Sequence, residues 1–430
     1  MPVQIVVDQL VSTLDRRHFE LKNMKLIILT DVFFPDTIGG AGRVVYYLCL
    51  ELSKKGHENH IITRNINGDL PSYEEFNKNF FVHRFNLSQN ESLGSFLKEV
   101  KNSYSLAKKI SKEISFDLIC IHQSMAAIGP LLSGYLKGIP VIYYFHSPWY
   151  EEYLIKKRTA NRNFTIRDRI ISSIMKMIEK KILKRSIKVI VLSDYMGKKV
   201  SQIHGYPRDK VTIIPGGVDL DRFHLPIGGK TATKKDLDLS QDRAIFLTIR
   251  NLVPRMGLES LIEAFNRSKV LREKSLMLIG GKGFLEIRLK KMVNKSNLEH
   301  CIRFLGYIPD KDLTKFYQAA DYFILSTSKL EGFGLVILEA MACGTPVLGT
   351  PIGAIPEVIG AFDKRLIFKG ADWKGILEKL EEIFEKPDIY NFSPKKCMGF
   401  VENNYSWEKA GDMFEKEVIV LFTKNLENRR

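Results

Sequence analysis

The sequence contains no apolar run close to the roughly 20 residues that a membrane-spanning helix needs. Its first residues also lack the basic start and apolar block that mark a signal peptide. Both absences argue against a membrane span and against secretion. We therefore expect a cytoplasmic protein.

Cysteine is scarce, and no cysteine or histidine spacing is typical of a metal site. The five cysteines form no Cys-x-x-Cys pair, and the nine histidines include no His-Glu-x-x-His. An odd number of scattered cysteines also does not indicate a disulfide framework. We expect free thiols, no metal requirement and no cofactor.

Internal repeats and low-complexity tracts are absent too, and the order of the apolar segments indicates the fold. A chain of 430 residues suggests two domains of about 200 residues each. Strands alternate with helices, which predicts an α/β protein with two Rossmann-like, doubly wound parallel sheets and ligand sites at the carboxyl ends of the strands. The predicted strands of the first domain are 24–30, 60–62, 118–121, 141–144 and 189–192. Those of the second are 211–214, 244–247, 276–279, 302–305 and 322–325.

The polar link at residues 204–207 marks the predicted domain boundary. The first domain is thus expected to span residues 1–205 and the second residues 206–405. Residues 1–23 precede the first strand and receive no role.

The chain carries a strong positive charge, +16, from 65 basic and 49 acidic residues. Such an excess suits anionic partners such as nucleotide sugars, anionic lipid or nucleic acid. The segment 156–188 is the most basic, and apolar residues recur in it at helical spacing. It predicts a helix that lies on an anionic membrane surface or packs on its own domain, and both alternatives stay open. No helix-turn-helix, zinc-finger or RNA-binding signature is present, so nucleic acid is not an expected partner.

The most informative segment is Glu331-Gly-Phe-Gly-Leu-Val-Ile-Leu-Glu339, which continues through Gly344-Thr345-Pro346. It lies between a predicted strand and a predicted helix, so Glu331 and the amides of Gly332 and Gly334 are expected at a helix N-terminus that favours an anion. Glu339 follows eight residues later, which on a helix returns it to roughly the same face. A nucleotide sugar would use one carboxylate for its sugar and the other for its ribose. The alternative is an ordinary amphipathic helix with two solvated glutamates.

This segment resembles the signature of the retaining glycosyltransferases of family 4, which have the GT-B fold. In that family the first glutamate faces the donor sugar, the second binds the ribose, and the amides between them meet the diphosphate. The resemblance spans residue 24 to the C-terminus and implies these roles for the following residues: Glu331, Glu339, Gly332, Phe333, Gly334 and Leu335. It also implies that a closing helix over 406–430 crosses back onto the first domain.

Two glycine-containing turns extend the resemblance. Gly39 and Gly40 lie between the first strand and its helix, where the family has a loop that roofs the diphosphate; the alternative is a simple turn. Gly306-Tyr307-Ile308 matches the segment whose backbone frames the base.

His146 directly follows a predicted strand, and such a strand-end side chain is expected to point into the crevice between the domains. In the family a histidine here hydrogen-bonds the donor sugar near its reacting carbon. The alternative is a structural histidine packed by Trp149.

Arg250 and Arg255 are the predicted cations for the leaving diphosphate. The chain departs here from the family pattern, because Asn251 and Met256 stand where the family has arginine and lysine. The two arginines lie one residue early, and on a strand this shift turns a side chain to the opposite face. Lys329 is the substitute if they cannot reach the site.

Together these features predict a retaining hexosyltransferase that moves a sugar from a nucleoside diphosphate donor to a glycan, a lipid-linked sugar or a small molecule. A UDP-sugar is the favoured donor, with GDP-mannose as the other candidate, in cell-surface polysaccharide or glycoconjugate biosynthesis. Asn251 and Met256 motivate one alternative, a GT-B protein that binds a nucleotide sugar or a partner without turnover. A second alternative, a nucleic-acid-binding protein, rests on the net charge alone.

Overall fold

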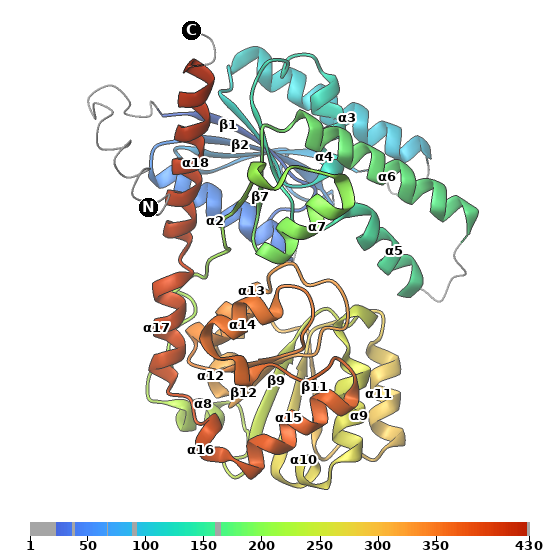
Figure 1. Ribbon diagram of the computed structural model, residues 1–430, viewed down its shortest axis with the longest axis vertical. Helices are drawn as coiled ribbons and strands as arrows, with labels where there is room; N and C mark the ends of the chain where they lie inside the picture. The colour runs from blue at the N-terminus through green and yellow to red at the C-terminus, as the bar shows by residue number, and fades with distance from the viewer. Residues whose placement is uncertain (1–22, 37–38, 67, 88–92, 160–164, 428–430) are drawn as a thin grey trace.

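A computed structural model describes residues 23–36, 39–66, 68–87, 93–159 and 165–427 as two α/β domains, one above the other in Figure 1. The N-terminal segment without an assigned role lies almost wholly outside the described residues, as do residues 428–430 of the predicted closing helix.

The first domain is built on an eight-stranded sheet of order β3-β4-β2-β1-β5-β6-β7-β8. All neighbours are parallel except β3 and β4. The strands are β1 (Lys25–Leu29), β2 (Glu58–Asn65), β3 (Tyr73–Asn77), β4 (Phe80–Asn86), β5 (Leu118–Ile121), β6 (Val141–Tyr144), β7 (Lys188–Val191) and β8 (Val211–Ile213). The helices are α2 (Gly40–Lys54), α3 (Leu93–Glu113), α4 (Ser124–Leu132), α5 (Trp149–Thr159), α6 (Ile166–Arg185) and α7 (Asp194–His204).

The second domain has a five-stranded parallel sheet of order β11-β10-β9-β12-β13. Its strands are β9 (Ala244–Ile249), β10 (Ser275–Gly280), β11 (Ile302–Gly306), β12 (Tyr322–Leu325) and β13 (Val347–Gly349). Its helices are α8 (Lys230–Asp236), α9 (Leu258–Arg267), α10 (Lys269–Lys274), α11 (Glu286–Lys295), α12 (Leu313–Ala319), α13 (Leu335–Ala342), α14 (Ile355–Asp363), α15 (Trp373–Glu385), α16 (Pro387–Tyr390) and α17 (Pro394–Asn404).

Each sheet has a topological switch point, where the strand order reverses. β1 lies between β2 and β5, and β9 lies between β10 and β12. Ligands bind at such points because the connections leave the sheet in opposite directions and open a crevice at the strand ends. The loops after β1, β5, β9 and β12 are therefore the expected binding loops.

The prediction that 211–214 belongs to the second domain is wrong. Val211–Ile213 forms β8, which pairs with β7 at the edge of the first sheet through the register Val189↔Val211 and Val191↔Ile213. An apolar pattern predicts a strand but does not indicate which sheet edge it joins. The change of domain therefore lies beyond residue 213.

The final helix α18 (Trp407–Glu427), red in Figure 1, runs along the first domain. The Trp407 ring stacks on Tyr47 of α2 with centroids 5.2 Å apart. Further along, His57 Nε2 lies 3.0 Å from Glu415 Oε1. The C-terminal end of the chain thus ties the two domains together.

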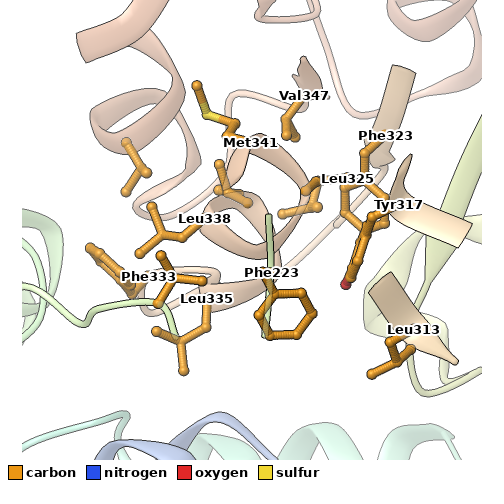
Figure 2. Packing of buried hydrophobic residues seen from close by; sticks show 14 of the residues in the cluster. Phe223, Leu313, Tyr317, Phe323, Leu325, Phe333, Leu335, Leu338, Met341 and Val347 are labelled. Carbon is orange, nitrogen blue, oxygen red and sulfur yellow. The ribbon is translucent and has the colours of Figure 1, made fainter. Parts of the chain in front are cut away.

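Helix α13 is buried in the core of the second domain. Its Leu338 and Met341 are fully buried, and Figure 2 shows them beside Leu325 of β12 and Val347 of β13. A helix that is apolar on nearly every side has to be enclosed by its domain. This packing holds the loop before α13 in place.

Among the described residues, no helix is at once long and apolar enough to cross a membrane. The same residues contain no group of three His, Cys, Asp or Glu side chains placed to hold a metal ion. All five cysteines are free and buried.

Candidate functional site

The predicted site residues gather around a cavity of about 460 Å³ between the N-terminal ends of α2 and α13, here called the central cavity. It is lined from both domains. Ten of the predicted residues line it: Gly39, Gly40, Arg250, Arg255, Tyr307, Ile308, Glu331, Gly334, Leu335 and Glu339.

An arginine–glutamate pair occupies the centre of the site. Arg250 follows β9 and Glu331 follows β12, so adjacent strands at the switch point bring them together, with Arg250 Nη2 2.6 Å from Glu331 Oε2. Burial raises the pKa of Glu331, but the charges of Arg250 and Arg255 outweigh it and lower the pKa overall. Glu331 is therefore an ionised, buried carboxylate.

The two arginines retain donors for a ligand. Nη1 of Arg250 is buried and has no hydrogen-bond partner among the described residues. Arg255 donates from Nη1 to the carbonyl of Leu330 at 2.8 Å, and burial, more than the neighbouring charge of Arg250, lowers its pKa. Since a guanidinium remains protonated at neutral pH, both side chains present positive charge to the cavity.

The one-residue shift of Arg250 and Arg255 does not turn their side chains away from the site. Residues 250–256 form a loop and a 3-10 turn, Pro254–Met256, rather than a strand, so the alternation of strand faces does not govern them. Met256 is buried, and its carbonyl accepts a hydrogen bond from Ser326 Oγ at 2.7 Å. Asn251 is exposed at the cavity. Lys329 is exposed and lines a different cavity, so it does not replace the arginines here.

The expectation that Glu331 and Glu339 lie on one face of the same helix is also wrong. Helix α13 begins at Leu335, and Gly334 before it has a φ of 88°, which favours glycine. Glu331 thus lies in the loop, and only Glu339 lies on the helix. Both still line the central cavity.

Glu331 is held from behind by a close backbone contact. The amide of Ala354 donates to the carbonyl of Glu331 at 3.0 Å. A Cβ on Gly353 would lie 2.3 Å from that same carbonyl oxygen. A side chain larger than glycine at 353 would therefore displace Glu331.

Glu339 lies at the other end of the central cavity. It is 6% exposed, and Tyr317 donates a hydrogen bond from its hydroxyl to Oε2 at 2.9 Å. The other carboxylate oxygen receives no hydrogen bond from the described residues and remains for a ligand. A hydroxyl pair, such as that of a ribose, would complete the hydrogen bonding.

Gly40, at the first turn of α2, faces the start of α13. A Cβ on Gly40 would lie 3.9 Å from Leu335 Cδ1. The first amides of an α-helix have no partner within the helix, and the helix dipole is positive at this end. Two helix N-termini from different domains therefore border the same space, which suits a diphosphate.

A smaller cavity of about 200 Å³, here called the histidine cavity, adjoins the central one. His146 follows β6 and lines it, as do Glu331, Gly332 and Phe333. Burial lowers the pKa of His146 to about 4, so its ring is neutral at pH 7.

His122, which the sequence reasoning missed, holds His146. It follows β5, stacks on Tyr144 with centroids 4.4 Å apart, and places Nδ1 3.0 Å from His146 Nε2. Burial lowers its pKa as well, so one neutral ring donates to the other. Its Nε2 is buried and has no partner among the described residues. A buried N–H without an acceptor is rarer than an acceptor without a donor, so the proton of His122 belongs on Nδ1 and that of His146 on its own Nδ1.

The backbone between Gly332 and Phe333 contacts the first domain. Ser193 Oγ donates to the carbonyl of Gly332 at 2.7 Å. Within the second domain, Phe333 is buried with its ring 6.0 Å from that of Tyr405. Glu357 accepts from the amide of Asp194 at 2.8 Å, at the start of α7. These contacts hold the signature loop in the crevice between the domains.

At the expected base end, Tyr307 and Ile308 line the central cavity, whereas Gly306 does not. Gly306 instead turns the chain, with a φ of 68°, and its carbonyl accepts from the amide of Gly281 at 2.6 Å. Arg43 of α2 reaches across the domains to Asp310 with nitrogen–oxygen distances of 3.0 and 3.1 Å. The sequence reasoning missed this ion pair, since nothing in the sequence places α2 against the loop after β11.

Two family models match the chain, "Glycosyltransferase Family 4" over residues 38–222 and "Glycosyl transferases group 1" over residues 229–407. The chain belongs to glycosyltransferase family 4. It is accordingly a glycosyltransferase, an enzyme. The boundary between the two matches lies beyond residue 213, in agreement with the position of β8.

The relatives within the family are diverse in name. A GDP-mannose-dependent monoacylated alpha-(1-6)-phosphatidylinositol monomannoside mannosyltransferase of Corynebacterium glutamicum is 31% identical over 206 residues, which cover 46% of this chain and 53% of the relative. An uncharacterised glycosyltransferase of Methanocaldococcus jannaschii is 26% identical over 345 residues, covering 78% and 83%. The mannosylfructose-phosphate synthase of Agrobacterium fabrum is 29% identical over 74% of this chain and 73% of its own.

Solved structures show the same fold at low identity. The sucrose-phosphate synthase of Thermosynechococcus elongatus superimposes with a TM-score of 0.79 at 20% identity, covering 93% of this chain and 100% of that one. Anabaena HepE, in complex with UDP and glucose, reaches 0.71 at 15% identity, covering 92% and 100%. The fold is GT-B, as the sequence predicted.

Proposed function

We propose that this family 4 enzyme is a retaining hexosyltransferase that uses a nucleoside diphosphate sugar, with a UDP-sugar as the first candidate donor and GDP-mannose as the second. Its acceptor is a glycan, a lipid-linked sugar or a small molecule in polysaccharide or glycoconjugate biosynthesis. The donor binds in the central cavity with its ribose at Glu339 and its transferred sugar at Glu331.

The observation that carries this proposal is the Arg250–Glu331 pair beside Arg255. A departing diphosphate gains negative charge as its bond to the sugar breaks, and fixed cations stabilise that charge without reorganising. Arg250 keeps one buried nitrogen that has no hydrogen-bond partner in the part of the chain that the structure describes, so it has a donor available for a phosphate oxygen. The carboxylate of Glu331 holds the same guanidinium in position.

The proposed reaction is a front-side displacement that retains configuration. The neutral His146 donates a hydrogen bond to the donor sugar, and the departing phosphate oxygen accepts the proton of the acceptor hydroxyl. The new glycosidic bond forms as the bond to the diphosphate breaks. In this scheme the protein contributes position and electrostatics and requires no metal.

The alternative of a protein that binds a nucleotide sugar without turnover loses its motive in this structure. It rested on Asn251 and Met256 at the usual cation positions, yet Arg250 and Arg255 supply two cations to the same cavity. A nucleic-acid-binding role still rests on net charge alone.

Thermal unfolding in the presence of UDP, GDP, ADP and their sugars tests the donor assignment, because a ligand of the folded state raises its stability. Incubation with the stabilising donor should then release nucleoside diphosphate, slowly in water and faster with an acceptor. Binding without any release would overturn the assigned activity. The anomeric configuration of the product tests retention.

We also propose that α6 lies on an anionic membrane surface. One edge of the helix packs on its domain through Ile182 and Leu183, which are buried. The opposite stripe is open, with Ile166 78%, Ile170 55%, Ile174 45% and Met177 52% exposed. Lysines flank this stripe, an arrangement that suits anionic headgroups around an apolar insertion.

Sedimentation with vesicles of anionic or neutral lipid tests this second proposal. Ile170→Ser/Ile174→Ser should abolish binding to anionic vesicles, whereas Ile227→Ser/Ile389→Ser, at exposed positions elsewhere, should not. Equal binding by both double variants would refute it.

A further inference from the structure

A third cavity, of about 820 Å³, opens between the two domains next to the site and is here called the basic cavity. Helix α11 and the turn before α9 form most of it, and Ile155 of α5 borders it from the first domain. Its lining residues are Ile155, Pro254, Arg255, Glu259, Phe284, Leu285, Ile287, Arg288, Lys291, Met292, Lys295, Ser328 and Lys329. The proposed donor and reaction scheme do not use it.

The lining is strongly cationic. Among the described residues that line it, five are basic and one, Glu259, is acidic. Arg288 lies 4.0 Å from Glu259, and no acidic side chain in the described part of the chain pairs with Lys291, Lys295 or Lys329. Cations gathered around a hollow, with little internal neutralisation, favour an anionic ligand.

The remaining lining is apolar and partly open to solvent. Phe284 is 65% exposed and Ile287 is 71% exposed, and both lie on the α11 side of the cavity. Exposed apolar groups beside a basic hollow suit a ligand that joins an anionic group to a hydrocarbon portion.

The basic cavity shares a lining residue with the two cavities of the reacting centre. Arg255 lines the basic, the central and the histidine cavities. Ser328 and Lys329 belong to the loop that leads directly to Glu331. Helix α5, which borders the cavity through Ile155, packs against α6. A molecule in this cavity would therefore lie between helix α5 and the loop that leads to Glu331.

We propose that the basic cavity binds the phosphate and adjoining hydrocarbon of a lipid-phosphate acceptor, so that the acceptor's hydroxyl enters at Glu331 and His146. The proposal rests on the proposed glycosyl transfer and names the class of its acceptor. Arg288, Lys291, Lys295 and Lys329 hold the phosphate, and Phe284, Ile287 and Met292 contact the chain.

Three probes, titrated calorimetrically below their micellar concentrations, separate the charge from the chain. Octyl phosphate carries both, octyl glucoside only the chain, and inorganic phosphate only the charge. Octyl phosphate should bind at least about tenfold more tightly than either of the others, because it gains from both contacts. If octyl glucoside bound as tightly as octyl phosphate, the cavity would not require an anionic group. If inorganic phosphate bound as tightly as octyl phosphate, the cavity would not require a hydrocarbon chain, and a free sugar phosphate would replace the lipid phosphate as the ligand.

Charge reversal locates the site. Lys291→Glu/Lys295→Glu, on the exposed face of α11, should weaken octyl phosphate by about tenfold or more. The control Lys274→Glu/Lys395→Glu changes the net charge equally at exposed positions that do not line the cavity, and it should alter binding less than about twofold. Equal weakening by both pairs would overturn the site.

Binding of the nucleoside diphosphate to the same variants keeps the two proposals apart. It should be unchanged in Lys291→Glu/Lys295→Glu, since these lysines do not line the central cavity. If the wild type bound no nucleoside diphosphate, the proposed donor chemistry would fail while the octyl phosphate result stood.

Discussion

The two domains contribute different kinds of side chain to the reacting centre, charged on the second domain and neutral histidines on the first. On the second domain, two arginines and a carboxylate are gathered within one cavity, and the carboxylate is ionised. On the first domain, two neutral histidines, His122 and His146, line the adjoining histidine cavity, and burial lowers their pKa values.

This difference separates two tasks. The donor brings a diphosphate whose charge grows during transfer, so the fixed charges belong on the side that binds it. The sugar hydroxyls and the acceptor hydroxyl are neutral, and neutral donors can orient them without competing for the phosphate. Substitution of the two arginines should therefore lower the transfer rate more than substitution of the two histidines.

The largest expected effect is on the charged side. Arg250→Gln should lower the transfer rate by about 10²–10³-fold, since one positioned donor at a developing charge commonly contributes that much. Binding of the nucleoside diphosphate should weaken only a few-fold. Arg255→Gln should act in the same direction but less strongly, because one of its nitrogens is engaged by the carbonyl of Leu330.

The control is Arg267→Gln, which removes an arginine paired to Glu263 and more than half exposed. Its rate should match the wild type. Wild-type rates in both Arg250→Gln and Arg255→Gln would show that another cation stabilises the leaving diphosphate, and would refute this assignment.

The neutral side should show a smaller and graded response. His146→Ala should reduce turnover about a hundredfold, and His122→Ala about tenfold, because His122 acts only by orienting His146. His122→Asn, whose amide can donate the same hydrogen bond, should recover much of the loss. Steady-state kinetics of the three variants would measure this, and equal losses in His122→Ala and His122→Asn would contradict the orienting role.

On this neutral side, the sequence predicted one of the two histidines and carried an equal signal for the other. His146 could be placed because it directly follows a strand, and the same signal is present at His122 after β5. The pairing of the two rings could not be predicted, since it depends on β5 and β6 being neighbours in the sheet.

On the charged side the residue types were predictable and the geometry was not. Glu331, Glu339 and the arginines follow from the signature and the spacing, and they line one cavity. The expectation that the shifted arginines point away from the site assumed a strand, whereas the chain forms a loop and a 3-10 turn there. Lys329 was assigned from its distance along the chain to Glu331, but the loop directs it to the basic cavity.

The smallest expected effect is on stability. The pKa of His146 falls from 6.5 to about 4 on folding. Between these pH values the unfolded chain binds a proton that the folded chain does not. The contribution of His146 to the free energy of unfolding is therefore complete above pH 6.5 and declines as the pH falls toward 4. One such group contributes at most about 1.4 kcal/mol per pH unit.

Urea unfolding at pH 7.5 and pH 5 would measure this decline. His146→Gln should flatten it partially, because His122 and His83 also have lowered pKa values and remain. An unchanged pH dependence in His146→Gln would contradict a neutral His146 in the folded protein.

The most direct test of the central claim compares the two carboxylates of the central cavity. The measurement is the nucleoside diphosphate affinity and the transfer rate of Glu331→Ala and Glu339→Ala, with Glu331→Gln as a variant that keeps the side-chain volume. Glu339→Ala should weaken nucleoside diphosphate binding about tenfold or more, because it removes the proposed contacts to the ribose hydroxyls. Both Glu331 variants should bind it nearly as the wild type does and lose transfer. Wild-type affinity in Glu339→Ala, or wild-type transfer in Glu331→Gln, would contradict the division of the donor between these two residues.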